Sequence, residues 1–344
     1  LDADSGRQLW AFTAGGRIDS PPTIYRGLAL FGSADGYVYA LRAHDGQLAW
    51  RFLAAATDQR LGSFGQLESV WPVPGNVLVQ DGVLFCVAGR SMFLDGGLRM
   101  WRLDPETGHV LSETPLDDGS SDASSDPQAY VSWLNMPTAL PDILSCDGRL
   151  VYMRSQPFRL DGTRLPLEAM PTTGDADRGA PEPTQSAELA HLFSPTGFLD
   201  DTNWHRTYWM YGSRFISGWS GYFLAGKAAP AGKLLVFDDQ KVYGFGRKPK
   251  YFRWSTPIEH QLFAARKPGT EDAAPDVLPD ATAGPQRPAG FSVVHDWTRD
   301  LPILARGLVL SDGRLFVAGP PDLVDEEAAF RAFEDPQVQE QMGR

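Results

Sequence analysis

The chain has 344 residues, of which 42% are hydrophobic and 22% charged, and its formal net charge is −12. This composition is globular, and its negative field argues against a nucleic-acid partner because phosphate is repelled. No stretch approaches 18 consecutive apolar residues, so we predict no transmembrane segment. The only basic run, "GRKPKYFR" at 246–253, is expected to be a solvated edge or hairpin.

A phrase typical of a tight turn occurs three times in the first third of the chain, as "LDADSG", "LRAHDG" and "LDPETG". Its closing glycines are Gly6, Gly46 and Gly108. The ninth position after each leading Leu holds Trp10, Trp50 and Ser112. Polar residues that lead to a Gly, flanked by apolar and aromatic runs, predict antiparallel strands joined by a turn that needs positive φ.

A second phrase, an apolar run on each side of a DG-type turn, occurs five times, from "YRGLALFGS" to "SDGRLFVAG". The turn glycines are Gly27, Gly82, Gly148 and Gly313, and Gln240 takes this place in "FDDQKVYGFG". Hairpins repeated with these spacings predict four-stranded antiparallel units with inserted loops. We therefore predict an all-β fold, a β-propeller of four-stranded blades, with a sandwich or barrel as the competing architecture.

Residues 1–52, with "LDADSGRQLW", "SPP" and "FGSADGYVYAL", resemble the pyrroloquinoline-quinone (PQQ) type of propeller repeat. The resemblance is specific over residues 1–115 and weaker beyond, where the chain resembles an insertion-rich bacterial branch of PQQ-like propellers. It implies that the Trp of each Leu-Trp pair packs on the next blade, which gives this role to Trp10 and Trp50. Ser112 departs from the pattern, so this contact should be absent or replaced there.

The chain begins within a repeat and ends after a strand, so it resembles a fragment of a longer protein, with about five to six blades of one propeller domain over residues 1–344. "DEEAAFRAFEDPQ" predicts a short C-terminal helix. The expected segments are a closing strand of a preceding blade (1–12), blades (17–52, 66–115, 130–163), a mobile loop (164–189), one or more blades with an aromatic insertion (190–265), a second mobile loop (266–290), a partial blade (291–320) and a helical segment (321–344).

The aromatic insertion "SPTGFLDDTNWHRTYWMYGSRFISGWSGYF" at 194–223 combines Trp residues with charged groups. Packing between blades is one reading of this segment, and a polar–aromatic binding patch is the other. The candidate patch residues are Asp200, Asp201, Asn203, Trp204, His205, Arg206 and Trp209. A glycan or another small molecule would use Trp204, Trp209 and Trp219 as a stacking platform.

The chain carries no recognisable catalytic or metal-binding motif, so no catalytic residue, metal site or cofactor is predicted. PQQ-dependent dehydrogenases, which this repeat resembles, have a vicinal cysteine pair and a calcium site. Here Cys86 and Cys146 are 60 positions apart, and the sequence leaves open whether they pair.

The function expected from these features is a non-catalytic scaffold that binds protein partners. Family resemblance places it in the periplasm or on the cell surface of a bacterium. The alternatives are an oxidoreductase that uses PQQ and Ca²⁺, and a propeller that binds a glycan or another small molecule.

Overall fold

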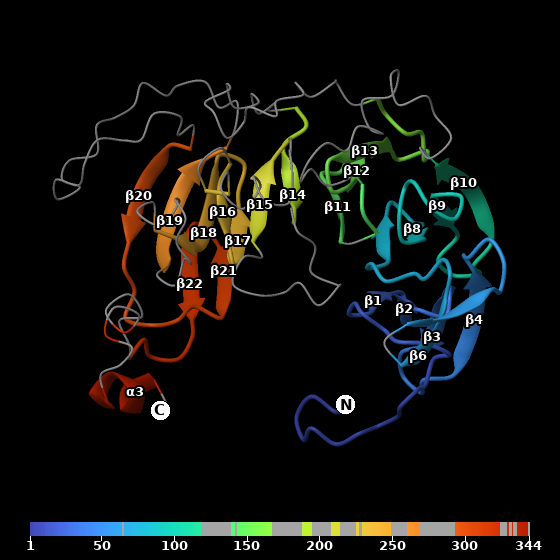
Figure 1. The fold of residues 1–344 in the computed structure, drawn as a ribbon, viewed down its shortest axis with the longest axis horizontal. Helices are drawn as coiled ribbons and strands as arrows, with labels where there is room; N and C mark the ends of the chain where they lie inside the picture. Colours follow the sequence, from blue (N-terminus) through green and yellow to red (C-terminus); the bar gives the residue numbers. More distant parts are fainter. Residues whose placement is uncertain are drawn as a thin grey trace. The chain divides into compact units, whose positions relative to one another are not determined.

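The computed structural model describes residues 1–63, 65–117, 139–141, 143–166, 188–194, 208–213, 225–226, 229–248, 260–267, 293–323, 329, 332 and 336–342. Its contacts divide the chain into two compact units (Figure 1). Unit 1 holds strands β1 to β13, and unit 2 holds strands β14 to β22 with helix α3. The predicted single domain and its internal boundaries stay predictions.

Unit 1 contains two four-stranded antiparallel sheets whose strands follow one another in chain order (Figure 1). The first sheet comprises β1 (Thr23–Tyr25), β2 (Leu28–Gly32), β3 (Tyr37–Arg42) and β4 (Leu48–Leu53). The second comprises β7 (Leu78–Gln80), β8 (Val83–Ala88), β9 (Leu98–Leu103) and β10 (Val110–Leu116). A three-stranded sheet follows, with β11 (Leu144–Cys146), β12 (Leu150–Met153) and β13 (Gln156–Arg159).

The predicted DG-type hairpins are all present, in both units. Their turns join β1 to β2, β7 to β8, β11 to β12, β17 (Leu234–Phe237) to β18 (Lys241–Arg247) and β21 (Gly307–Ser311) to β22 (Arg314–Ala318). At Asp81-Gly82 both residues have positive φ, 49° and 76°, which is the backbone of a type I′ turn. The same holds at Asp312-Gly313, with 48° and 71°. The glycines are there because the turn needs this conformation.

The turn with Gln240 in the glycine position is held by hydrogen bonds to the side chain of Asp238. Asp238 Oδ1 accepts hydrogen bonds from the backbone N–H of Gln240 and of Lys241, at 2.9 and 2.8 Å. The hydroxyl of Tyr243 donates to Oδ2 of the same carboxylate at 3.1 Å. Asp147 accepts the same set of bonds in the hairpin of Gly148. Gln240 does not have positive φ, so its position needs no glycine.

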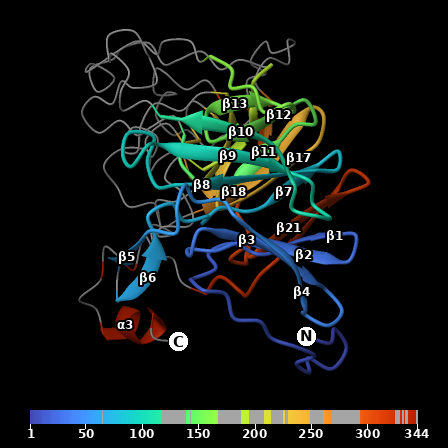
Figure 2. The same ribbon diagram turned by 90° about the vertical axis from the view of Figure 1, so that its right-hand side faces the viewer.

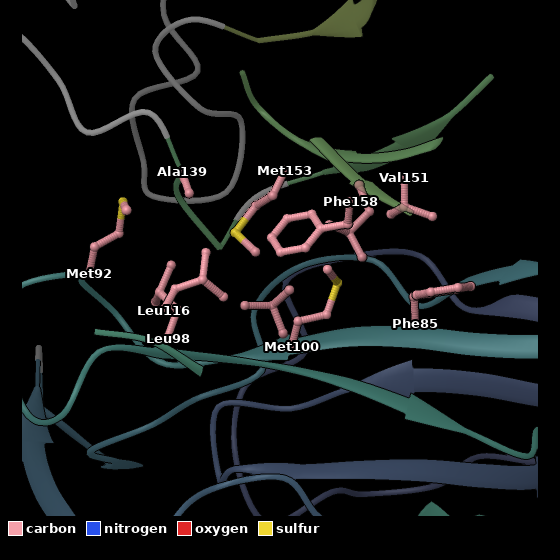
Figure 3. Packing of buried hydrophobic residues seen from close by; sticks show 11 residues of the cluster. Phe85, Met92, Leu98, Met100, Leu116, Ala139, Val151, Met153 and Phe158 are labelled. Carbon is pink, nitrogen blue, oxygen red and sulfur yellow. The ribbon is translucent and has the colours of Figure 1, made fainter. Parts of the chain in front are cut away.

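Strand β8 shows why the sheets of unit 1 stack as blades. Its buried side chains alternate between two cores: Leu84, Cys86 and Ala88 join a cluster with the first sheet, and Phe85 and Val87 join a cluster with the third. Successive side chains of a strand point to opposite faces, so a strand that is apolar throughout must be covered on both sides. Figure 3 shows side chains of the second cluster pointing toward one another from the strands of two sheets.

Unit 2 contains one four-stranded sheet and two smaller ones among its described residues. The four-stranded sheet comprises β17, β18, β19 (His260–Arg266) and β20 (His295–Arg299). The smaller sheets comprise β14 (His191–Phe193), β15 (Trp209–Gly212) and β16 (Ala231–Gly232), and then β21 and β22. The backbone N–H of Arg266 donates to the carbonyl of Val294 at 3.1 Å, so the chain ends that connect β19 with β20 lie side by side.

The predicted fold class is confirmed: the described residues are nearly all-β, and three of their antiparallel sheets have the four strands of a propeller blade. A short C-terminal helix is present as α3 (Pro336–Met342), which begins only at the end of the stretch 325–337 that predicts it. Most of that stretch lies outside the described residues, and residues 321–323 of the segment expected to be helical are not helical, since Pro321 forms a β-bridge with Ile303. A hairpin, β5 (Arg60–Ser63) with β6 (Gln66–Ser69), belongs to neither neighbouring sheet (Figure 2). Nothing in the repeat pattern predicted it.

Residues 1–12 contain no strand in the structure, although a closing strand is expected there. They do contain the turn of the repeat: Gly6 N–H donates to Asp2 O at 2.9 Å, as Gly46 N–H donates to Arg42 O at 2.8 Å. A strand forms by pairing with a neighbour, and within the described chain no strand pairs with these residues. The repeat therefore fixes the turn locally, whereas the strand needs a partner.

Candidate functional site

The predicted binding patch falls almost wholly outside the described residues. Of its seven members, Asp200, Asp201, Asn203, Trp204, His205 and Arg206 lie there, as does Trp219 of the stacking platform. Trp209 is described: it is half-buried in β15, opposite Gly232 of β16. The patch and the platform stay predictions.

The tryptophans of the repeat contact the turn of the following sheet. A methyl group built on Gly46 would lie 2.4 Å from Cε3 of Trp10, and the Trp10 indole N–H donates to Ala43 O at 3.0 Å. Trp50 repeats this arrangement, because a methyl group on Gly108 would lie 2.7 Å from its Cε3. Glycine is thus required at these turns for positive φ and also for room under the indole ring.

At the next position of the repeat, polar side chains replace the tryptophan. Arg102 Nη1 donates to the hydroxyl of Ser112 at 3.2 Å and to the carbonyl of Asp161 at 2.9 Å. Thr114 donates to Gly162 O at 2.7 Å. The sequence expectation that the contact is absent or replaced at Ser112 matches this arrangement, in which hydrogen bonds join the second sheet to the loop after β13.

Unit 2 gathers three basic side chains around one buried phenol ring. The ammonium group of Lys233 lies 5.0 Å and the guanidinium carbon of Arg247 lies 5.6 Å from the ring centroid of Tyr208. The His260 ring is stacked on the same phenol, 6.2 Å between centroids. Tyr208 is 1% exposed and Arg247 4%. We call Tyr208, Lys233, Arg247 and His260 the basic–aromatic cluster.

The strands of unit 2 bring the basic–aromatic cluster together at one sheet end. Tyr208 comes directly before β15 and Lys233 directly before β17, while Arg247 ends β18 opposite His260 at the start of β19. Since neighbouring strands are antiparallel, these termini meet on one side. Tyr208 also directly follows the stretch of the chain that carries most of the predicted patch.

The basic run at 246–253 is therefore not a solvated edge where the structure describes it. Arg247 is buried and donates from Nη2 to Ala225 O at 2.8 Å, and Lys248 pairs with Asp300 at 3.0 Å. The sequence alone could have indicated this. Because alternate side chains of a strand point to the same face, Arg247 lies on the same face as Phe245. A cation on an aromatic face indicates a specific contact.

The charged form of Lys233 is disfavoured in this setting. Burial lowers the pKa of its ammonium group to about 8, because removing a cation from water disfavours the charged form. Titratable groups with shifted pKa values gather at functional sites, although structural clusters shift them too. The basic–aromatic cluster is the candidate ligand site of unit 2.

In unit 1, a buried carboxylate anchors the β5–β6 hairpin. Glu68 is 2% exposed and lies between two arginines, 2.6 Å from Arg90 Nη2 and 3.3 Å from Arg17 Nη1. The backbone N–H of its neighbour Ser69 donates to Ala34 O at 2.7 Å. Three segments that are separate in sequence are therefore tied together at the base of the hairpin.

The outer part of that hairpin is apolar and open. Leu67 is 65% exposed and lies opposite Gly62, where a methyl group would meet no atom within 4 Å. Leu94 and Ile18, on the chain segments that carry Arg90 and Arg17, are also exposed, 66% and 42%. These three exposed side chains lie on segments that the ion pairs of Glu68 tie together, and exposed apolar side chains that gather on one surface mark protein-binding sites.

The described residues show neither a metal centre nor a disulfide. No group of three or more potential metal ligands occurs among them, and Cys86 and Cys146 are both free. Burial raises the pKa of the Cys86 thiol, which makes it a structural thiol of the core. No helix in this part of the chain is long and apolar enough to cross a bilayer.

Comparison with known proteins agrees with the repeat in unit 1. The family model described as "Outer membrane protein assembly factor BamB" matches residues 1–156. The outer membrane protein assembly factor BamB of Burkholderia pseudomallei (strain K96243) is 32% identical over 113 residues, which are 32% of this chain and 25% of the relative. The chain thus spans about a quarter of the length of the curated relative it matches.

Similar solved structures share little sequence with the chain. BamB from Moraxella catarrhalis has a TM-score of 0.34 at 11% identity, covering 76% of this chain and 62% of its own. A europium-containing methanol dehydrogenase has a TM-score of 0.34 at 15% identity, covering 76% and 42%. Quinohemoprotein alcohol dehydrogenase from Comamonas testosteroni has a TM-score of 0.26 at 20% identity, covering 33% and 17%.

The resemblance that the motifs carry is confirmed. The family model matches residues 1–156, in agreement with PQQ-like propeller repeats there, and the matched range ends at the first residue of β13.

Proposed function

We propose that the chain is a non-catalytic scaffold that binds a protein partner, in an exported bacterial protein of the periplasm or cell surface. The family match over residues 1–156 supports this assignment, since the matching relative is named for a role in protein assembly. The stacked sheets of unit 1 supply a rigid base, because β8 is packed on both faces.

The observation that carries the proposal is the β5–β6 hairpin. Its base is fixed by the ion pairs of Glu68, and it presents Leu67 to solvent. A rigid apolar anchor loses little conformational entropy on binding, so a small contact gives useful affinity. A protein partner would cover Leu67 and approach the exposed side chain of Leu94.

The test is a quantitative co-purification with the full chain and its Leu67→Asp variant. Envelope extract of the parent bacterium is passed over each immobilised protein, and bound proteins are quantified by mass spectrometry. We expect a partner that wild type retains in stoichiometric amount to fall at least tenfold with Leu67→Asp. Leu48→Asp on β4, where the leucine is 47% exposed, is the matched control and should retain the partner.

Two results would contradict the proposal. Equal retention by wild type and Leu67→Asp would remove the hairpin from the interface. Dye reduction with alcohols or aldoses after addition of PQQ and Ca²⁺ would overturn the non-catalytic assignment.

A further inference from the structure

We propose that the outer edge of β5, the side of this strand away from β6, binds an extended segment of a protein partner as a third strand of the β5–β6 hairpin (Figure 2). The segment would place an aromatic or large aliphatic side chain opposite Gly62. This inference rests on the proposed function, since it names the form in which a partner binds the hairpin.

The pairing within the hairpin determines which backbone groups point outward. The N–H of Val70 donates to Gln59 O at 3.0 Å, just before the ladder begins. Hydrogen-bonded and non-bonded pairs alternate along an antiparallel ladder, so the next pair is non-bonded and so is the third. These two pairs are Arg60 with Ser69 and Gly62 with Leu67. Their N–H and C=O groups therefore point away from the other strand of the hairpin.

The outer edge of β6 already contacts the rest of unit 1. The outward N–H of Ser69 donates to Ala34 O at 2.7 Å, and its C=O accepts a bond from Arg90 Nη2 at 3.1 Å. Both contacts agree with the outward direction that the alternation gives to Ser69. They also occupy the base of this edge, so β6 is the side by which the hairpin is attached.

The outer edge of β5 is open within the described part of the chain. No strand other than β6 pairs with β5 there, and no other backbone group bonds to the N–H or C=O of Arg60 or Gly62. Both residues are exposed. A strand edge with free donors and acceptors is a template for another strand, whose main-chain hydrogen bonds supply the affinity.

Gly62 defines which side chain the added strand should carry. Its φ is not positive and a methyl group there would meet no atom within 4 Å, so neither the turn nor a neighbour requires glycine. A glycine inside a strand often marks a place where another backbone approaches closely. It also leaves a gap beside Leu67, its cross-strand neighbour, which is 65% exposed. A large side chain opposite Gly62 would cover this gap and contact Leu67.

The first test uses fluorescein-labelled heptapeptides and the full chain, with binding followed by fluorescence anisotropy. The probe alternates threonine and valine and has phenylalanine at its centre. We expect saturable binding, and about tenfold weaker binding when glycine replaces the phenylalanine. Two further probes are N-methylated on alternate residues, one on the odd and one on the even positions. Only one of them should bind, because a strand turns every second N–H toward its neighbour.

The second test changes the edge of β5. Gly62→Pro removes the outward N–H and no hydrogen bond of the hairpin, and proline is accepted on edge strands. We expect it to bind the phenylalanine probe at least about tenfold more weakly than wild type, since the ring also obstructs the approaching strand. A thermal unfolding scan checks that the variant is folded.

The matched control is Ile24→Pro on β1, the edge strand of the first sheet. Ile24 is 65% exposed, and Tyr25 and Leu28 next to it close a two-residue turn as a hydrogen-bonded pair. The N–H of Ile24 therefore also points away from the neighbouring strand. Ile24→Pro should bind the probe as wild type does.

Strand addition would be overturned by absence of probe binding to wild type, by equal binding of the two N-methylated probes, or by unchanged binding in Gly62→Pro. The N-methylated probes decide the question on wild type alone if Gly62→Pro does not fold. In the co-purification, a partner lost with Leu67→Asp but retained by Gly62→Pro would overturn strand addition and leave the proposed function in place. Retention by both variants would contradict both.

Discussion

The two junctions that join successive sheets of unit 1 meet the same demand with different chemistry. Between the first and second sheets, Trp50 covers Gly108, and its indole N–H donates to Pro105 O at 3.2 Å. Between the second and third, Arg102 and Thr114 hydrogen-bond to the loop that contains Gly162. Both junctions place a side chain over a glycine, since a methyl group on Gly162 would lie 2.8 Å from Cδ of Arg102, but only at the first junction is that side chain an indole ring.

The inner cores of these junctions also differ. The fully buried side chains of the core shared by the first two sheets are aliphatic apart from Cys86, and partly buried aromatic rings that include Trp50, Trp71 and Trp101 pack against them. The core shared by the second and third contains Phe85, Phe158 and three methionines. Aromatic rings are thus only partly buried in the first core, whereas Phe85 and Phe158 are fully buried in the second. The comparison teaches that successive sheets of one stack can be joined by an indole ring at one junction and by hydrogen bonds at the next.

The largest effect should come from Gly108→Ala. The substituted residue would have to keep a backbone φ of 73°, and its methyl group would lie 2.7 Å from the Trp50 indole. Backbone strain therefore adds to steric overlap. We expect a loss of about 3 kcal/mol in the free energy of unfolding, measured by urea denaturation. Gly6→Ala is the matched control: its φ is 68° with no atom within 4 Å, and it should lose only about 1 kcal/mol. Equal losses would show that shape is not what the first junction requires.

Trp50→Ala should cost less, about 2 kcal/mol, because the ring is half-buried and full burial sets the upper end of such losses. Combined with Gly108→Ala, the losses should not add, since the overlap disappears with the ring. A double-variant cycle of unfolding free energies measures this coupling. Strict additivity would contradict direct packing of the indole on the glycine.

Arg102→Met should cost about 1 kcal/mol, the usual size of a hydrogen bond that is partly open to water. The substitution keeps much of the apolar stem and removes the bonds to Ser112 and Asp161 O. Urea denaturation is again the measurement, with Arg7→Met on the exposed N-terminal turn as the control that should be neutral. A loss as large as that of Trp50→Ala would make the two junctions energetically alike.

The smallest effect is a dependence on pH at the turn below Trp50. The hydroxyl and then the backbone N–H of Thr107 donate to Asp104 and lower the pKa of its carboxyl group. A lowered folded-state pKa means that the stabilisation is complete above the unfolded value and is lost as pH falls through the folded one.

We therefore expect wild type to exceed Asp104→Asn in stability by about 0.5 kcal/mol at neutral pH, with the difference vanishing toward pH 2. Thr107→Val should reduce this pH dependence without abolishing it, because the backbone N–H bonds of residues 106 and 107 to Asp104 remain. A difference between wild type and Asp104→Asn that does not change with pH would exclude the carboxylate as its source.

Local chemistry determined how much of this molecule the sequence could predict. The turns at Gly27, Gly82 and Gly313 were predictable because positive φ selects glycine, whatever the strands around it do. The basic–aromatic cluster was not, since Tyr208 and Lys233 meet only through the pairing of strands distant in sequence. Only Arg247 could have been singled out from the sequence, because it is a cation on the aromatic face of its strand. The β5–β6 hairpin was not predicted because Glu68, which anchors it, pairs with arginines from two other segments.

The hydrogen bond between Arg266 and Val294 has a practical consequence for handling the protein. It brings the two ends of a connection together, so the register of β19 with β20 does not depend on how many residues run between them. Closing a loop of half the length changes the entropy term by only about 0.6 kcal/mol. We accordingly expect an affinity tag or a fluorescent label inserted into this connection to leave the pairing of β19 with β20 in place.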